Sequence, residues 1–186
     1  MFETRRTRYH GVAIALHWLI ALAIAANFAL GLYMTELPLS AGPIKLKLYS
    51  YHKWAGVTIF ALVLLRIVWR ATHRPPDMPP GMALWERTAA GVAHIVLYGL
   101  TLAVPLTGWL FSSAKGFQTV YFGVLPIPDL LSKDALLADL LHGAHENLNW
   151  LLAAVVLLHV AAALKHHLIS RDDVLSRMLP LVRPRN

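Results

Sequence analysis

Two histidines, His145 and His159, stand fourteen residues apart in the last long apolar segment of the chain. At about 100° per helical residue, fourteen steps come to about 1400°, which is about 40° short of four full turns. Both imidazoles are therefore expected on one face of one helix, about 21 Å apart along its axis. Since neutral imidazole binds transition metals, such a helix can supply one ligand to each of two stacked redox centres.

The composition of the chain indicates a membrane protein and limits its metal chemistry. Of 186 residues, 57% are hydrophobic and 15% are charged, whereas about a quarter of the residues in a soluble domain are charged. No cysteine is present, so disulfides, iron–sulfur clusters and thiolate-bound metals are excluded. Histidine, methionine and carboxylate side chains remain as ligands, and ten histidines are available.

Four apolar stretches are long enough to cross a bilayer, since a hydrocarbon core about 30 Å thick needs about 20 helical residues. The first stretch follows a basic segment, as a signal peptide does, but it exceeds the core of about 7–15 residues of such a peptide. It also contains His17, so we expect an uncleaved span. The predicted spans cover residues 12–34, 52–69, 88–111 and 145–168 of one domain. The sequence therefore predicts an all-α membrane protein, a four-transmembrane-helix bundle.

The basic residues predict the orientation of this bundle. With four spans, every arginine falls on the side of the two termini, so the positive-inside rule makes both termini cytoplasmic. Such a basic rim suits anionic lipid headgroups, and the net charge of +7 does not require nucleic acid as a partner. The inner set is Arg5, Arg6, Arg8, Arg66, Arg70, Arg74, Arg87, Lys165, Arg171, Arg177, Arg183 and Arg185. The outer set is Lys45, Lys47, Lys53, Lys115 and Lys133.

The third and fourth spans are joined by a long outer loop with an apolar segment at residues 121–131. This segment contains Gly123 and two prolines, which argue against a fifth helical span. We expect a short interfacial segment there.

The intramembrane histidines pair naturally by depth. An ionisable side chain inside a membrane helix is a functional candidate because burying it without a partner is costly. His52 opens the second span at the outer face and pairs with His145, whereas His17 lies near the inner side and pairs with His159. Each pair can hold one haem iron from two sides. We therefore predict a bundle that encloses two haems, with these four histidines as axial ligands.

Two further histidines compete for these roles. His94 lies about two turns from the inner end of the third span, where the sequence barely separates it from His17 as an inner ligand. Because His159 needs only one partner, we assign His94 to the haem edge or to a quinone pocket. His142 competes with His145, but seventeen residues to His159 leave it about 100° off the shared face.

Several other residues near these histidines are candidates for contacts with a haem or a quinone. Arg66 follows His52 by fourteen residues, so it is expected either to pair with a propionate of the inner haem or to anchor the helix at the inner surface. His166 and His167 end the fourth span as interfacial residues or as hydrogen-bonding groups for a quinone carbonyl. Gly56, four residues after His52, leaves a gap where a flat macrocycle can lie.

These residues resemble the bacterial cytochrome b561 family of four-helix, dihaem membrane cytochromes, which are related to the b subunits of nickel–iron hydrogenases and formate dehydrogenases. The resemblance spans nearly the whole chain. It is carried by LHW at 16–18, HKWAG at 52–56, AH at 93–94, HE at 145–146, LH at 158–159 and HH at 166–167. It implies His17/His159 and His52/His145 as bis-histidine haem sites, and a quinone site near the inner haem at Arg66, His94 or His166.

The resemblance also frames the expected function. The short segment after the fourth span resembles the stand-alone members, some of which oxidise superoxide and reduce quinone, whereas larger members dock an iron–sulfur protein. We expect an oxidoreductase of the bacterial inner membrane that oxidises superoxide outside and reduces ubiquinone. The alternative is a membrane-anchor electron-relay cytochrome b subunit for a partner dehydrogenase or hydrogenase. The outer lysines can steer a small anion, but carboxylates on the same side offset them; these are Asp129, Asp134, Asp139, Glu36 and Glu146.

Overall fold

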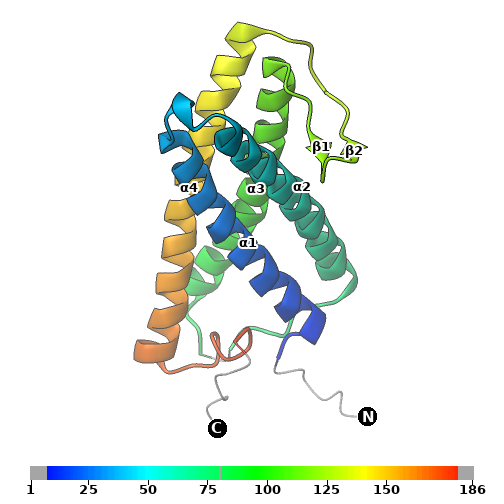
Figure 1. The fold of residues 1–186 in the computed structure, drawn as a ribbon. Coiled ribbons are helices and arrows are strands. Elements are labelled where there is room, and N and C mark those ends of the chain that lie inside the picture. The colour runs from blue at the N-terminus through cyan, green and yellow to red at the C-terminus, as the bar shows by residue number, and fades with distance from the viewer. Residues whose placement is uncertain (1–7, 80, 180–186) are drawn as a thin grey trace.

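The computed structural model describes residues 8–79 and 81–179, in which four long helices form a bundle (Figure 1). The helices are α1 (Gly11–Glu36), α2 (Pro43–Thr72), α3 (Leu84–Lys115) and α4 (Ala135–Lys165). Each is long and apolar enough to cross a membrane, which confirms the predicted four-helix membrane fold. Helix α1 begins and α4 ends at one end of the bundle (Figure 1). We call this the inner end and the opposite end the outer end.

Short elements connect the four helices. A 3₁₀ turn, η1 (Leu39–Ala41), joins α1 to α2, and a π-helical turn, η2 (His166–Ser170), follows α4. The connection from α3 to α4 contains a hairpin of β1 (Val120–Tyr121) and β2 (Leu125–Pro126).

Four of the predicted inner basic residues lie outside the described residues, namely Arg5, Arg6, Arg183 and Arg185.

Helices α2 and α4 start earlier than the apolar pattern indicates. Helix α2 begins nine residues before His52 and α4 begins ten residues before His145, so neither histidine opens its helix as we expected. Pro43 occupies the first turn of α2, where a missing N–H costs nothing. The Asp134 carboxylate caps α4 by accepting the Leu137 N–H at 3.0 Å. Lys45 and Lys47 interrupt the apolar pattern at the start of α2, and Asp139 and His142 interrupt it at the start of α4. Hydropathy alone therefore marks only the later parts of both helices.

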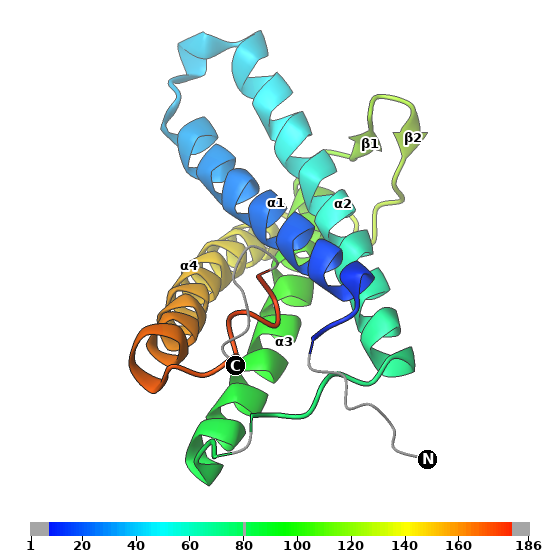
Figure 2. The same ribbon diagram turned by 90° about the horizontal axis from the view of Figure 1, so that it is seen from below.

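The main apolar core lies between α1 and α2. Ile20, Ile59 and Val63 are buried against one another, and Leu102 of α3 packs against them. Helix α1 packs along α2, and α3 packs along α4; the view from below shows α1 beside α2 (Figure 2). Ile20 follows His17 on the outer side, whereas Ile59 follows His52 on the inner side. The core therefore forms an apolar layer between the depths of these two histidines.

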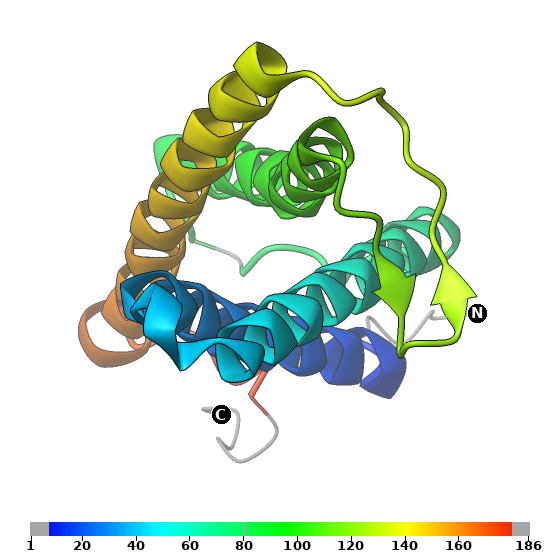
Figure 3. The same ribbon diagram turned by 45° about the horizontal axis from the view of Figure 1, so that its top comes forward.

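The hairpin packs on the side of α2 (Figure 3). The Trp54 indole donates to the Val120 carbonyl at 2.7 Å. The hairpin turn has positive φ at Phe122 (50°) and at Gly123 (73°), a conformation that glycine adopts readily and phenylalanine seldom does. The apolar segment 121–131 thus forms most of a hairpin and an irregular connection rather than a fifth helix.

The residues after η2 fold back beneath the inner end of the bundle (Figure 2). We call residues 171–179 the C-terminal segment. The Trp18 indole of α1 donates to the Met178 carbonyl at 2.8 Å, and Arg177 donates to the Asp77 carbonyl. Ser176 is buried. This segment is therefore attached both to α1 and to the connection between α2 and α3.

Candidate functional site

The outer histidine pair consists of His52 on α2 and His145 on α4. Their ring centroids are 6.2 Å apart and their planes lie at 89°. Nδ1 of His145 lies 2.9 Å from the Val104 carbonyl oxygen of α3. Since a carbonyl only accepts hydrogen bonds, Nδ1 carries the proton and donates it, which leaves the Nε2 lone pair for a metal.

Two glycines make room for these rings. A Cβ at Gly108 of α3 would lie 2.9 Å from Cε1 of His145, and a Cβ at Gly31 of α1 would lie 3.3 Å from Cε1 of His52. His145 therefore packs on the backbone of α3, and His52 packs on the backbone of α1. Neither of these two helices contributes a histidine to the outer pair. Neither contact was predicted from the sequence.

The inner pair consists of His17 on α1 and His159 on α4, whose ring centroids are 6.4 Å apart with planes at 63°. His94 of α3 also reaches this depth, and its centroid lies 5.6 Å from that of His159. The structure therefore brings together both predicted pairs and also the competitor. His142 instead packs on Phe111 at 5.0 Å.

The ring separations can be compared with the geometry of two imidazoles on one metal. An imidazole–metal bond of about 2.0 Å and a ring radius of about 1.1 Å place a centroid about 3.1 Å from the metal. Two rings on opposite sides of one metal then have centroids about 6.2 Å apart. The measured 6.2 Å and 6.4 Å match this value, whereas the 5.6 Å between His94 and His159 is shorter. Both predicted pairs fit a haem iron.

Arg66 points into the bundle rather than to the surface. Its Nη1 donates to the Ala13 carbonyl at 3.0 Å and its Nε donates to the Tyr98 hydroxyl at 3.2 Å. The guanidinium interacts electrostatically with all three inner histidines. Of the two interpretations from the sequence, this geometry favours a role at the inner site over a surface anchor.

His166 lies in η2 at the end of α4. Its Nδ1 is 2.6 Å from Oδ2 of Asp172, and the Asp172 N–H donates back to the His166 carbonyl at 3.2 Å. These two contacts fix the turn from which the C-terminal segment starts. This contact with Asp172 was not predicted from the sequence, and the two predicted roles of His166, at the interface and at a quinone carbonyl, stay predictions.

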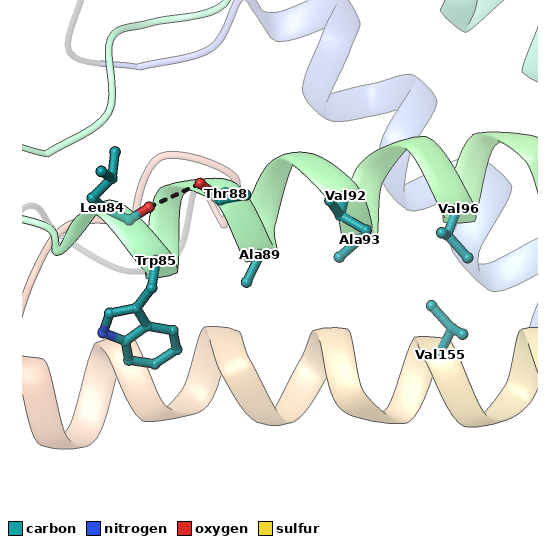
Figure 4. A pocket seen from close by; sticks show the side chains of 8 residues that line it. All are labelled: Leu84, Trp85, Thr88, Ala89, Val92, Ala93, Val96 and Val155. Carbon is teal, nitrogen blue, oxygen red and sulfur yellow. Dashed lines mark hydrogen bonds between the residues drawn. The ribbon is translucent and has the colours of Figure 1, made fainter.

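An apolar groove lies between α3 and α4 near the inner site (Figure 4). It measures about 980 Å³ and is lined by seven residues of α3, from Leu84 to Val96, and by Val155 of α4. Ala93 in this lining precedes His94, and Val155 lies one turn before His159. An apolar chain in the membrane can therefore lie within one helix diameter of the inner histidines.

The fold and the site define a four-helix membrane protein with two histidine pairs spaced for metal ligation. The family model described as prokaryotic cytochrome b561 matches residues 8–181, and the chain belongs to this family. It is therefore a b-type membrane cytochrome, and its role is in electron transfer.

Individual relatives agree with this assignment. The chain is 34% identical to cytochrome b561 homolog 2 of Escherichia coli K12 over 178 residues, which cover 96% of this chain and 94% of the relative. It is 29% identical to cytochrome b561 homolog 1 of the same organism, over 93% of this chain and 97% of the relative. It is also 28% identical to a probable superoxide oxidase, CybB, of Yersinia pestis, over 95% of this chain and 98% of the relative.

Proposed function

We propose that the chain binds two haem b groups and carries electrons across the bacterial inner membrane to ubiquinone, with both termini in the cytoplasm. One haem lies between His52 and His145, and the other lies between His17 and His159. The separations of 6.2 Å and 6.4 Å between the paired rings carry this proposal. Bound haem supplies reversible one-electron chemistry. The residues of the chain set its ligation, its surroundings and the access of reactants.

The donor at the outer end is proposed to be superoxide, an activity that the printed name of the Yersinia relative also contains. A small polar pocket of about 210 Å³ lies between α2 and the hairpin, one residue along α2 from His52. Lys53 lines it together with Ser50, Gln118 and Thr119. Its ammonium group donates to the Phe117 carbonyl at 2.9 Å, and a positive charge here attracts a small anion.

Two of the other outer lysines are engaged elsewhere. Lys115 lies 3.8 Å from the Asp139 carboxylate, which partly offsets its charge. The Lys45 ammonium donates to the Leu37 carbonyl at 2.5 Å and is absent from the pocket lining. Of the predicted outer lysines, we therefore propose Lys53 as the one that attracts the anion. It is next in sequence to His52, a proposed ligand of the outer haem.

Ubiquinone is proposed to bind at the inner end, where Arg66, Tyr98 and His94 offer polar groups beside the inner pair. The apolar groove on α3 suits the isoprenoid tail. Two superoxide anions each lose one electron and leave as dioxygen, while one ubiquinone takes up two electrons and two protons to form ubiquinol. Electrons and protons balance without a further reactant.

Haem quantitation and a quinone assay test this proposal. The purified chain is expected to hold two b-type haems, and His17→Ala and His52→Ala are each expected to remove one; His142→Ala, on the outer half of α4, serves as the matched control. In liposomes, superoxide generated outside is expected to reduce ubiquinone, and His52→Ala is expected to abolish this. One haem or none in the unmodified chain contradicts the paired sites. Two haems without superoxide-driven reduction, together with co-purification of a dehydrogenase, indicate an electron-relay subunit instead.

A further inference from the structure

The hairpin formed by β1 and β2 reaches far along α2 instead of resting on the outer end of the bundle. The hydroxyls of Tyr121 and Thr58 are 2.8 Å apart. Helix α2 runs from Pro43 to Thr72, so Thr58 lies at its midpoint, about 22 Å from either end at about 1.5 Å per residue. The hairpin turn is therefore held beside the middle of a helix that spans the membrane.

The position of Thr58 places the hairpin turn at hydrocarbon depth. Arg70 ends the apolar part of α2 at the inner surface, twelve residues after Thr58. This interval is about 18 Å along an untilted helix and less along a tilted one. Since the hydrocarbon core is about 30 Å thick, Thr58 lies inside it. The hairpin also bonds to Trp54, one turn nearer the outer end of α2, so the turn lies between the middle of the membrane and the outer interface.

The turn carries side chains that suit this depth. Phe122 is 63% exposed, Val124 is 83% exposed and Leu125 is 57% exposed within the chain itself. Residues 121–126 include no charged side chain. Water is a poor environment for three adjacent exposed apolar residues, whereas the acyl chains of the outer leaflet are a favourable one.

The backbone of the turn is also prepared for a medium without water. The Gly123 N–H donates to the Val120 carbonyl, and the Val124 N–H donates to the Tyr121 carbonyl, both at 3.1 Å. The Trp54 indole supplies a second donor to the Val120 carbonyl. Pairing these polar groups lowers the cost of placing this non-helical backbone near lipid.

We propose that the hairpin tip, residues 122–125, inserts into the outer leaflet beside α2 and is covered by lipid. The tip anchors the connection between α3 and α4 to the bilayer. It thereby holds the polar pocket at Lys53 and Thr119 at the membrane surface, where a water-soluble reactant can enter.

The complete absence of cysteine allows a direct test by site-specific labelling of the full chain. Val124→Cys receives an environment-sensitive fluorophore, and the protein is placed in nanodiscs with or without nitroxide-labelled lipid. Leu22→Cys, at a 66% exposed position in the middle of α1, is the control for lipid. Ser132→Cys, an exposed residue of the same connection, is the control for water.

We expect the label at position 124 to be quenched several-fold more strongly by nitroxide lipid than by aqueous iodide, as at position 22. The label at position 132 is expected to show the reverse. Iodide quenching at position 124 equal to that at position 132 overturns the proposal, because the tip is then in water. Protection from both quenchers overturns it as well, because protein, such as a second copy of the chain, then covers the tip.

An unlabelled pair of variants gives a second measurement. Val124→Lys places a charge in the leaflet, whereas Ser132→Lys leaves it in water. Only the first is expected to lower the thermal stability of the protein in nanodiscs, and the difference is expected to shrink in short-chain detergent, which adapts to the charge. Equal stability of the two variants in nanodiscs overturns the proposal.

Discussion

The contact between Gly108 and His145 gives a quantitative prediction for Gly108→Ala. The new methyl group would lie 2.9 Å from Cε1 of His145, whereas ordinary van der Waals contact begins at 3.4 Å. The imidazole must therefore move by at least about 0.5 Å. This movement disturbs the hydrogen bond of 2.9 Å from Nδ1 to the Val104 carbonyl, which fixes the orientation of the ring.

Loss of a hydrogen bond that orients a metal ligand typically lowers affinity for the metal by about 10–100-fold. We therefore expect Gly108→Ala to weaken outer haem binding by about this factor, which corresponds to about 1.4–2.7 kcal/mol, and to leave the inner haem bound. The assay is haem per chain after purification, with the reduced optical spectrum and a redox titration to show which of two components is lost or shifted.

Gly99→Ala is the matched control on the same helix, because no atom lies within 4 Å of a Cβ at Gly99. Both substitutions favour the helical state of α3 by up to about 1 kcal/mol, so their difference isolates the ring contact. Gly31→Ala is expected to have an intermediate effect on His52, since its Cβ contact is longer at 3.3 Å. Equal haem content, spectra and potentials in Gly108→Ala and Gly99→Ala would refute the reasoning.

Three further outcomes are expected. Arg66→Gln removes a positive charge beside the inner pair and should lower the midpoint potential of one haem in a redox titration, whereas Arg74→Gln, in the exposed connection after α2, should not. Trp18→Phe removes the hydrogen bond to the C-terminal segment, which is worth about 1 kcal/mol. The rate of tryptic cleavage within that segment should therefore rise about fivefold. The control Trp109→Phe, at the outer end of the bundle, should leave this rate unchanged. Asp134→Ala removes the cap of α4 and should lower the free energy of unfolding by about 0.5–2 kcal/mol, measured by thermal or denaturant unfolding, with an unchanged melting curve counting against the cap.

The proximity of each proposed ligand pair was predictable from the sequence because it depends on two simple quantities. Helical rotation placed His145 and His159 on one face of α4, and the order of the spans gave His52 and His17 their depths. The structure adds the distances of 6.2 Å and 6.4 Å between the paired rings. The haems themselves and their axial ligation remain predictions.

The remaining features depend on how the helices cross, which a single sequence does not encode locally. Contact of Gly108 with His145 requires α3 and α4 to approach at that level, and the inward direction of Arg66 requires Tyr98 on α3 as its partner. The early start of α4 was visible in principle, since Asp134 is a favourable N-cap residue, but Asp139, His142 and Gly143 interrupt the apolar run that follows it.

Helix α4 contributes one histidine to each pair without any break in its α-helical hydrogen bonding between Ala135 and Lys165. Adding or removing a single residue between His145 and His159 would turn one ring by about 100° relative to the other, and no loop lies between them to absorb the change. The connection between α2 and α3 has no such restriction. Exchange of lipid-facing side chains on α4 should therefore be tolerated far better than any change in the number of residues between its two histidines.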